Sequence, residues 1–155
     1  MIARKMRPEE LDSTMICFDY YKAEAIESLP KIADEYEYNS MLKTVRNFAS
    51  RWDHIWINAY DGTRVVGFIA GYASESPWNS DIVTANVAFV FLLKSHRNME
   101  NFRSLMREFE AWAQQISATE ITAGDIGIHP DENRRIYEHF GFKPILMMSK
   151  ELVNE

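Results

Sequence analysis

The spacing of apolar residues switches between a helical and an extended period along this chain. Leu11, Met15 and Phe18 recur at helical spacing. Pro8 and two following acids suit the first turn of that helix, and Pro30 marks its end. The same period predicts further helices over residues 39–50, 98–116 and 131–140. Gly141 then stands where a left-handed cap is expected.

Between these helices, apolar residues alternate or run together as they do in strands. Asp61-Gly62 separates two such runs and is typical of a hairpin turn. The extended pattern predicts strands over residues 2–6, 54–60, 64–73, 82–93, 119–128 and 142–150. The resulting order, β-α-α-β-β-β-α-β-α-β, predicts an α/β fold of mixed strand direction, with helices on both faces of the central sheet.

The composition predicts one domain spanning residues 1–155. The chain is 46% hydrophobic and 26% charged, as in ordinary globular proteins. The first residues lack the apolar core of a signal peptide, and no apolar run approaches the ~18 residues of a membrane span. Cys17 is the one cysteine, which fits a reducing compartment, and we expect it in the core of the first helix. These features predict a cytoplasmic protein.

Charge and histidine spacing narrow the choice of partners. The net charge is −6, from 17 basic and 23 acidic side chains, which argues against a nucleic-acid partner. The four histidines have no metal-like spacing with one another or with Cys17, so no metal site is expected. No membrane partner is expected either, and a homodimer is left open.

Two segments carry a resemblance to a known family. The first is the run Phe89 to Arg97 with the amphipathic helix after it, which ends in Trp112-Ala113. The second contains Tyr137-Glu138, two residues, then Gly141-Phe142. Together they resemble the GNAT superfamily of N-acetyltransferases, and the Trp-Ala ending resembles a phage-type variant. The resemblance implies a mostly antiparallel sheet, acetyl-CoA as cosubstrate and an acceptor amine that the sequence does not identify.

The resemblance also implies a diphosphate-binding loop at the start of the long helix. Amides at a helix N-terminus favour anions, and the arginines at the two ends of the loop add positive charge. The residues implied are Arg97, Asn98, Met99, Glu100, Asn101, Phe102 and Arg103. The family pattern has small residues where this chain has Glu100 and Phe102. Small residues let backbone approach phosphate closely, and Glu100 repels phosphate unless it points outward.

Further residues follow from the same resemblance. Backbone groups of Phe91, Leu92 and Leu93 are expected to contact the pantetheine arm. Tyr137 matches the position whose phenol, with an ordinary pKa of about 10, protonates the departing thiolate; its alternative is packing against the sheet. Asn133 is expected to contact the cofactor, and its alternative is a cap or a solvent-facing residue.

No single residue stands out as the base that deprotonates the amine. Glu75, Asp81 and His129 lie near the ends of predicted strands, where ligands gather in α/β sheets. An ordered water is the alternative to each of them. Trp78 is expected to stack on the acceptor, or else to anchor its own loop.

Two functional hypotheses remain open from the sequence. The first is direct transfer of an acetyl group to a primary amine. The second is a non-catalytic domain of the same fold for binding or assembly, encoded by a phage, and the altered loop motivates it. Catalysis requires neighbouring strands to part near Leu92 and Ile126, with neither Phe102 nor Glu100 filling the gap.

Overall fold

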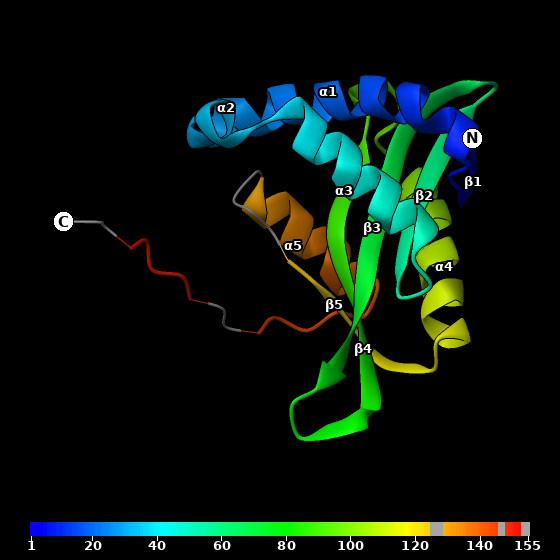
Figure 1. Ribbon diagram of the computed structural model, residues 1–155, viewed down its shortest axis with the longest axis vertical. Helices are drawn as coiled ribbons and strands as arrows, with labels where there is room; N and C mark the ends of the chain where they lie inside the picture. The colour runs from blue at the N-terminus through cyan, green and yellow to red at the C-terminus, as the bar shows by residue number, and fades with distance from the viewer. Residues whose placement is uncertain (125–128, 146–147, 153–155) are drawn as a thin grey trace.

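The computed structural model describes residues 1–124, 129–145 and 148–152 (Figure 1). The helices of this part are α1 (Leu11–Ser28), α2 (Lys31–Glu35), α3 (Tyr38–Ser50), α4 (Met99–Gln115) and α5 (Pro130–His139). The strands are β1 (Ile2–Lys5), β2 (His54–Asp61), β3 (Arg64–Ser76), β4 (Asn79–Leu92) and β5 (Ala118–Ala123). Short 3-10 turns at Pro8–Glu10 and Lys94–His96 precede α1 and α4.

The described strands form one sheet in the order β1-β2-β3-β4-β5. The first four pair antiparallel, and β4 pairs parallel with β5. The predicted hairpin turn is confirmed: Asp61 pairs with Arg64, and Gly62 has a φ of +60° that a glycine adopts without strain. This mixed, mostly antiparallel sheet confirms the predicted fold class.

Helices cover both faces of the sheet because successive residues of β3 point to opposite sides. On one side, the ring of Phe68 stacks on Phe18 of α1, 5.8 Å between centroids. On the other, Gly71 faces α4 so closely that an added Cβ would lie 2.6 Å from the ring of Phe109. Figure 1 shows α1 and α3 over the first face, with α4 on the opposite one.

The N-terminal and long helices match the predicted ones closely. Cys17 is 1% exposed in α1, as expected of a core residue, and burial raises the pKa of its thiol to about 12. Asn98 caps α4, because its side-chain oxygen accepts the Asn101 N–H at 2.9 Å. The helix α2, which begins after Pro30, was not expected from the sequence. In the described part of the chain, no helix is long and apolar enough to cross a membrane.

The strands depart from the prediction in two places. The β3–β4 hairpin is longer than expected, since Ser76 pairs with Asn79 and only Pro77-Trp78 forms the turn. The last predicted strand, residues 142–150, is wrong for residues 142–145 and 148–150, which form no strand. Pro144 has no N–H for a ladder and disfavours strand pairing there. Residues 146–147, and residues 125–128 at the end of the β5 prediction, lie outside the described part.

The pairing of β4 with β5 stops partway along β4. The ladder runs from Val83 beside Ala118 to Val87 beside Ala123, whereas β4 continues to Leu92. Beyond Val87, β4 therefore presents a backbone edge that no described residue of β5 covers. The parting of strands near Leu92 and Ile126 stays a prediction, because Ile126 lies outside the described residues.

Candidate functional site

A cavity of about 150 Å³ lies beside the uncovered part of β4. Residues from β4, α1, the start of α4 and one side of α5 form its walls. They are Tyr21, Glu24, Val87, Ala88, Phe89, Val90, Phe91, Leu92, Arg97, Phe102, Gly124, His129, Glu132, Asn133, Ile136 and Tyr137. Ligand pockets commonly measure ~300–1,000 Å³, so this cavity fits a narrow arm better than a whole nucleotide.

The backbone of β4 offers hydrogen-bonding groups to this cavity. The Leu93 N–H donates to the carbonyl oxygen of Val66, a residue of β3, at 2.8 Å, and so points toward β3. Because alternate residues of an antiparallel pair face the partner strand, Phe91 also bonds toward β3. The groups of Val90 and Leu92 face the opposite way, into the cavity. A peptide-like arm can pair with this edge as a further strand does.

This register shows how the three residues expected to contact a pantetheine arm, Phe91, Leu92 and Leu93, are oriented. Leu92 faces the cavity, as expected. Phe91 lines the cavity, but its N–H and C=O are directed at β3, and Leu93 is buried outside the lining. Val90, which sequence reasoning did not single out, presents its backbone groups on the cavity side. A one-residue offset reverses which groups face a strand's edge, so a predicted strand without a known register does not reveal them.

Helix α5 brings three expected residues to the cavity. His129, Asn133 and Tyr137 follow one another at four-residue steps, so they share one face of the helix. His129 stands at the N-cap position with a left-handed φ of +55°, and Pro130 opens the helix. The Tyr137 ring packs edge-on between Phe102, 6.0 Å away, and Phe142, 5.2 Å away. Tyr137 thus lines the cavity while its ring packs on α4 and on the segment after α5, whereas the alternative reading placed it against the sheet.

The loop before α4 leaves the cavity open. Glu100 is exposed and lies outside the cavity lining. Phe102 is 9% exposed and packs its ring 5.2 Å from Phe140 of α5, so it forms part of the wall. The bulky residue in place of a small one thus supports α5 from α4. Neither side chain closes the gap between the strands.

The other loop residues lie around the cavity without lining it. The Asn101 amide donates to His96 O at 2.8 Å and holds the loop against the helix start. Arg103 places its guanidinium 5.9 Å from the Phe140 ring centroid. Asn98 and Met99 form the first turn of α4, whose leading N–H groups have no carbonyl within the helix to bond. Amides in this position favour anions.

Arg97 is the loop residue that enters the cavity. Its guanidinium donates to Leu92 O through Nη2 at 2.7 Å and through Nε at 3.2 Å. It also pairs with the carboxylate of Glu24 on α1, Nη2 to Oε2 at 2.8 Å. Arg97 therefore joins the end of β4 to α1 across the cavity.

Three expected substrate residues lie elsewhere. Glu75, Trp78 and Asp81 are exposed on the part of the β3–β4 hairpin that projects past the sheet (Figure 1). Trp78 is 94% exposed, which also excludes it as an anchor of its loop. None of the three lines a cavity beside β4 or α5. The reason is the unexpected length of the two strands, which carries their turn away from the cavity.

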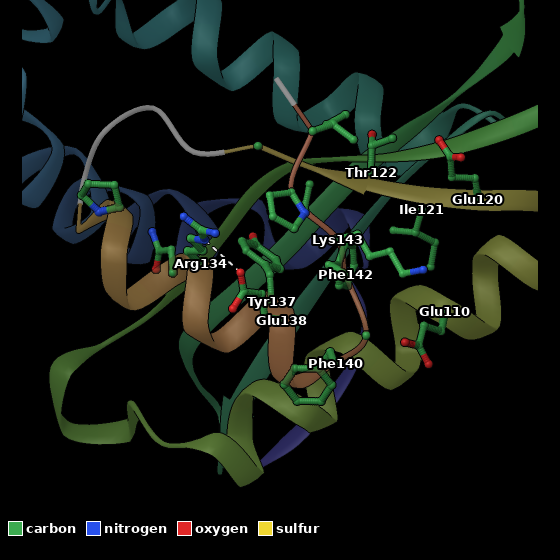
Figure 2. Close-up of a pocket in the computed structure, with 17 residues that line it drawn as sticks. Glu110, Glu120, Ile121, Thr122, Arg134, Tyr137, Glu138, Phe140, Phe142 and Lys143 are labelled. Atoms are coloured by element: carbon green, nitrogen blue, oxygen red, sulfur yellow. Dashed lines mark hydrogen bonds and ion pairs between the residues drawn. The ribbon is translucent and has the colours of Figure 1, made fainter. Parts of the chain in front are cut away.

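A second, larger cavity of about 550 Å³ lies on the other side of α5. Figure 2 shows Ile121 of β5 pointing toward the cavity and Tyr137 lying across it on α5, with Phe142 and Lys143 from the segment after α5 between them. Arg134 and Glu138 pair at 2.8 Å along the helix. Asn133, Tyr137 and Gly124 line both cavities, so the two spaces meet at the Tyr137 side of α5.

Sequence reasoning missed the contribution of α1. Tyr21 and Glu24 line the smaller cavity, and Tyr21 packs its ring 5.5 Å from Phe91. The signal for Tyr21 was present, because the apolar stripe that includes Phe18 continues at helical spacing to it, whereas the charged Glu24 gave no such signal. Among the described residues, no group of three or more side chains is arranged to hold a metal ion.

The chain was compared with protein families and with solved structures. The model of the Acetyltransferase (GNAT) family matches residues 17–142. No curated protein matches the chain in sequence. Many solved structures share its fold at low identity.

Three of these structures illustrate the likeness. A transcriptional regulator from Bacillus halodurans C-125 aligns with a TM-score of 0.74 at 16% identity, over 97% of this chain and 98% of that one. The enzyme AAC(6')-Iy, in complex with the bisubstrate analog CoA-S-monomethyl-acetylneamine, aligns with a TM-score of 0.70 at 12% identity, over 97% of both chains. The aminoglycoside antibiotic 6'-N-acetyltransferase AAC(6')-Ih from Acinetobacter baumannii aligns with a TM-score of 0.68 at 15% identity, over 97% and 98%.

Proposed function

Because the chain belongs to the Acetyltransferase (GNAT) family and is therefore an acyltransferase, we propose that it moves an acetyl group from acetyl-CoA to a primary amine by direct transfer. The observation that carries the proposal is the cavity bordered both by the part of β4 beyond its last described pair with β5 and by Tyr137 of α5. Backbone groups that can hydrogen-bond acetyl-CoA and a phenol that can protonate the leaving thiolate thus border the same cavity.

The pantetheine arm pairs with the backbone of Val90 and the N–H of Leu92 in this proposal. The diphosphate rests on the leading amides of α4, at Met99 and Glu100, where helix geometry leaves N–H groups free. The exposed Glu100 side chain points away from the cavity lining, so the repulsion anticipated from its charge is small. Asn133 borders the same space from α5.

The transfer itself makes one bond and breaks one. The amine nitrogen attacks the thioester carbon, and the N–C bond forms as the C–S bond breaks. The departing thiolate takes the phenolic proton of Tyr137, and the nitrogen releases its extra proton to a base, either a side chain or an ordered water. Holding both reactants side by side supplies much of the rate, and a positioned acid adds ~10²–10⁴-fold. His129 borders the cavity and is retained as the candidate that accepts the amine proton.

Binding of acetyl-CoA is the first test of this function. A ligand at 100 times its Kd stabilises the folded state by about 2.7 kcal/mol. In a chain of this size that raises the Tm by about 5–10 °C. Thermal melts with and without millimolar acetyl-CoA measure the shift, and thiol release with a panel of amines then measures transfer. An unchanged Tm would contradict the proposal and favour the non-catalytic binding domain.

A phage-type origin remains a prediction from the Trp112-Ala113 ending of α4, and a cytoplasmic location and a homodimer likewise remain predictions. None of them is required by the proposed chemistry.

A further inference from the structure

The ion pair between Glu24 and Arg97 closes one end of the smaller cavity. The two side chains are 73 positions apart in the sequence, on α1 and on the loop before α4. Two parallel bonds join them, Nη1 to Oε1 at 3.2 Å and Nη2 to Oε2 at 2.8 Å. Glu24 has 15% of its side chain exposed, and Arg97 has 38%. A carboxylate this buried needs a cation beside it, and Arg97 is its nearest one.

The same guanidinium is the natural partner of a diphosphate. Arg97 directly precedes Asn98, the cap of α4, so it stands next to the amides that favour an anion. A guanidinium binds phosphate oxygens through paired N–H groups just as it binds a carboxylate. Glu24 and the diphosphate of acetyl-CoA therefore compete for one cation.

When the diphosphate binds Arg97 in place of Glu24, the Glu24 carboxylate in the cavity wall loses the cation that balanced its charge. Its other cationic neighbour is Lys94, whose Nζ lies 3.9 Å from Oε1 on a side chain that is 75% exposed. A second cation that enters the cavity and binds Glu24 neutralises its charge as Arg97 did. The acceptor of an N-acetyltransferase carries such a charge when it is an ammonium ion.

We propose that Glu24 and Arg97 exchange partners during substrate binding, so that acetyl-CoA draws Arg97 away and frees Glu24 to bind a cationic acceptor. The inference rests on the proposed acetyl transfer. It assigns Glu24 as the residue that recognises the acceptor's charge, and the substrate class as amines that carry a second positive group besides the reacting nitrogen. It also makes the two substrates bind with positive coupling, each strengthening the other by the same factor.

The variant Glu24→Gln tests the competition, because it keeps the side-chain shape and removes the charge. Coenzyme A is titrated calorimetrically into the wild-type protein and the variant. We expect the variant to bind coenzyme A at least about fivefold more tightly, within the usual range of coupling. Glu27→Gln, an exposed carboxylate further along α1, is the matched control and leaves the affinity unchanged. Equal or weaker binding by Glu24→Gln would overturn the exchange.

Acceptor recognition is tested with 1,4-diaminobutane, titrated into the free protein and into its coenzyme A complex. The wild-type complex binds the diamine at least about fivefold more tightly than the free protein does, and Glu24→Gln shows no such difference. The same affinity for both wild-type states would overturn the inference. If coenzyme A binds neither the wild type nor the variants, the proposed function itself has failed, whereas normal coenzyme A binding without coupling removes only the role of Glu24.

Discussion

Tyr137 stands at the meeting point of both cavities, and its surroundings suit a positioned acid. Its ring is fixed by aromatic contacts with Phe102 and Phe142 on two sides. It lies one helical turn beyond Asn133, on the α5 face that borders the backbone edge of β4. A ring held by packing keeps its hydroxyl in place without help from the substrate, which is what a proton donor requires.

Removing that hydroxyl separates chemistry from binding. We expect Tyr137→Phe to lower kcat by ~10²-fold or more, with the affinity for acetyl-CoA nearly unchanged because the ring remains. Thiol release at saturating acetyl-CoA measures the first quantity and calorimetry the second. Tyr20→Phe, an exposed tyrosine of α1, is the control. Turnover that survives in Tyr137→Phe would assign the proton to water instead.

Among single residues, the sequence predicted the placement of those whose position depends on local spacing alone. His129, Asn133 and Tyr137 share a face of α5 because the helix period fixes that face. Glu24 is different, because its role depends on a partner 73 positions away. Backbone donors such as Val90 depend on strand register, which apolar pattern alone does not determine.

Among the elements, α4 contacts α5 through the ring of Phe102. Phe102 fills the space between the first turns of α4 and the rings of Tyr137 and Phe140. A small residue there would leave room for phosphate but would leave α5 without this support. Phe102 therefore helps to fix the position of the helix that carries Tyr137.

Phe102→Ala is expected to loosen α5. Truncating a buried phenylalanine costs about 3–5 kcal/mol, and the misplaced Tyr137 lowers turnover further. Denaturant unfolding measures the stability, and thiol release at a temperature where the variant stays folded measures the turnover. Phe102→Leu retains most of the apolar volume and should recover most of both. If Phe102→Ala is as stable and active as the wild type, α5 is held by other contacts.

Element boundaries were less predictable from the sequence than element types. The turn formers between residues 75 and 81 suggested a loop beside the site, yet the strands continue to a two-residue turn at Pro77-Trp78. Long-range pairing overrode the local turn signal there. The segment after Gly141 reads as a strand by composition, but in its described residues it leaves the sheet (Figure 1).

For the whole molecule, the N-terminal strand is tied to the helical layer by one charged contact. Arg4 of β1 donates to Glu10, at the start of α1, through Nη2 at 2.7 Å and Nη1 at 2.9 Å. The Arg7 N–H donates to the same carboxylate at 2.8 Å. This contact joins the edge of the sheet opposite β5 to the helix that forms one wall of the cavity.

The acid stability of the protein should report this contact. Hydrogen bonding to Arg4 lowers the pKa of Glu10 from 4.5 to about 2. A lowered folded-state pKa adds stability above pH 4.5, and that stability is lost as the pH falls toward 2. Because Glu10 is partly exposed, the contribution is about 1 kcal/mol. Denaturant midpoints between pH 7 and 2 measure it.

The variant Glu10→Gln should be less stable at pH 7 and should lose less stability on acidification, so that its curve approaches the wild-type curve near pH 2. Glu9→Gln, an exposed neighbour outside the Arg4 contact, should follow the wild type throughout. Parallel curves for Glu10→Gln and the wild type would show that protonation of other carboxylates accounts for the acid response. The pKa values of Asp53 and Asp61 are also lowered, by hydrogen bonds to His54 and His96. The wild-type curve therefore continues to fall with acid after the Glu10 contribution is removed, and only the difference between the two curves belongs to the Arg4–Glu10 contact.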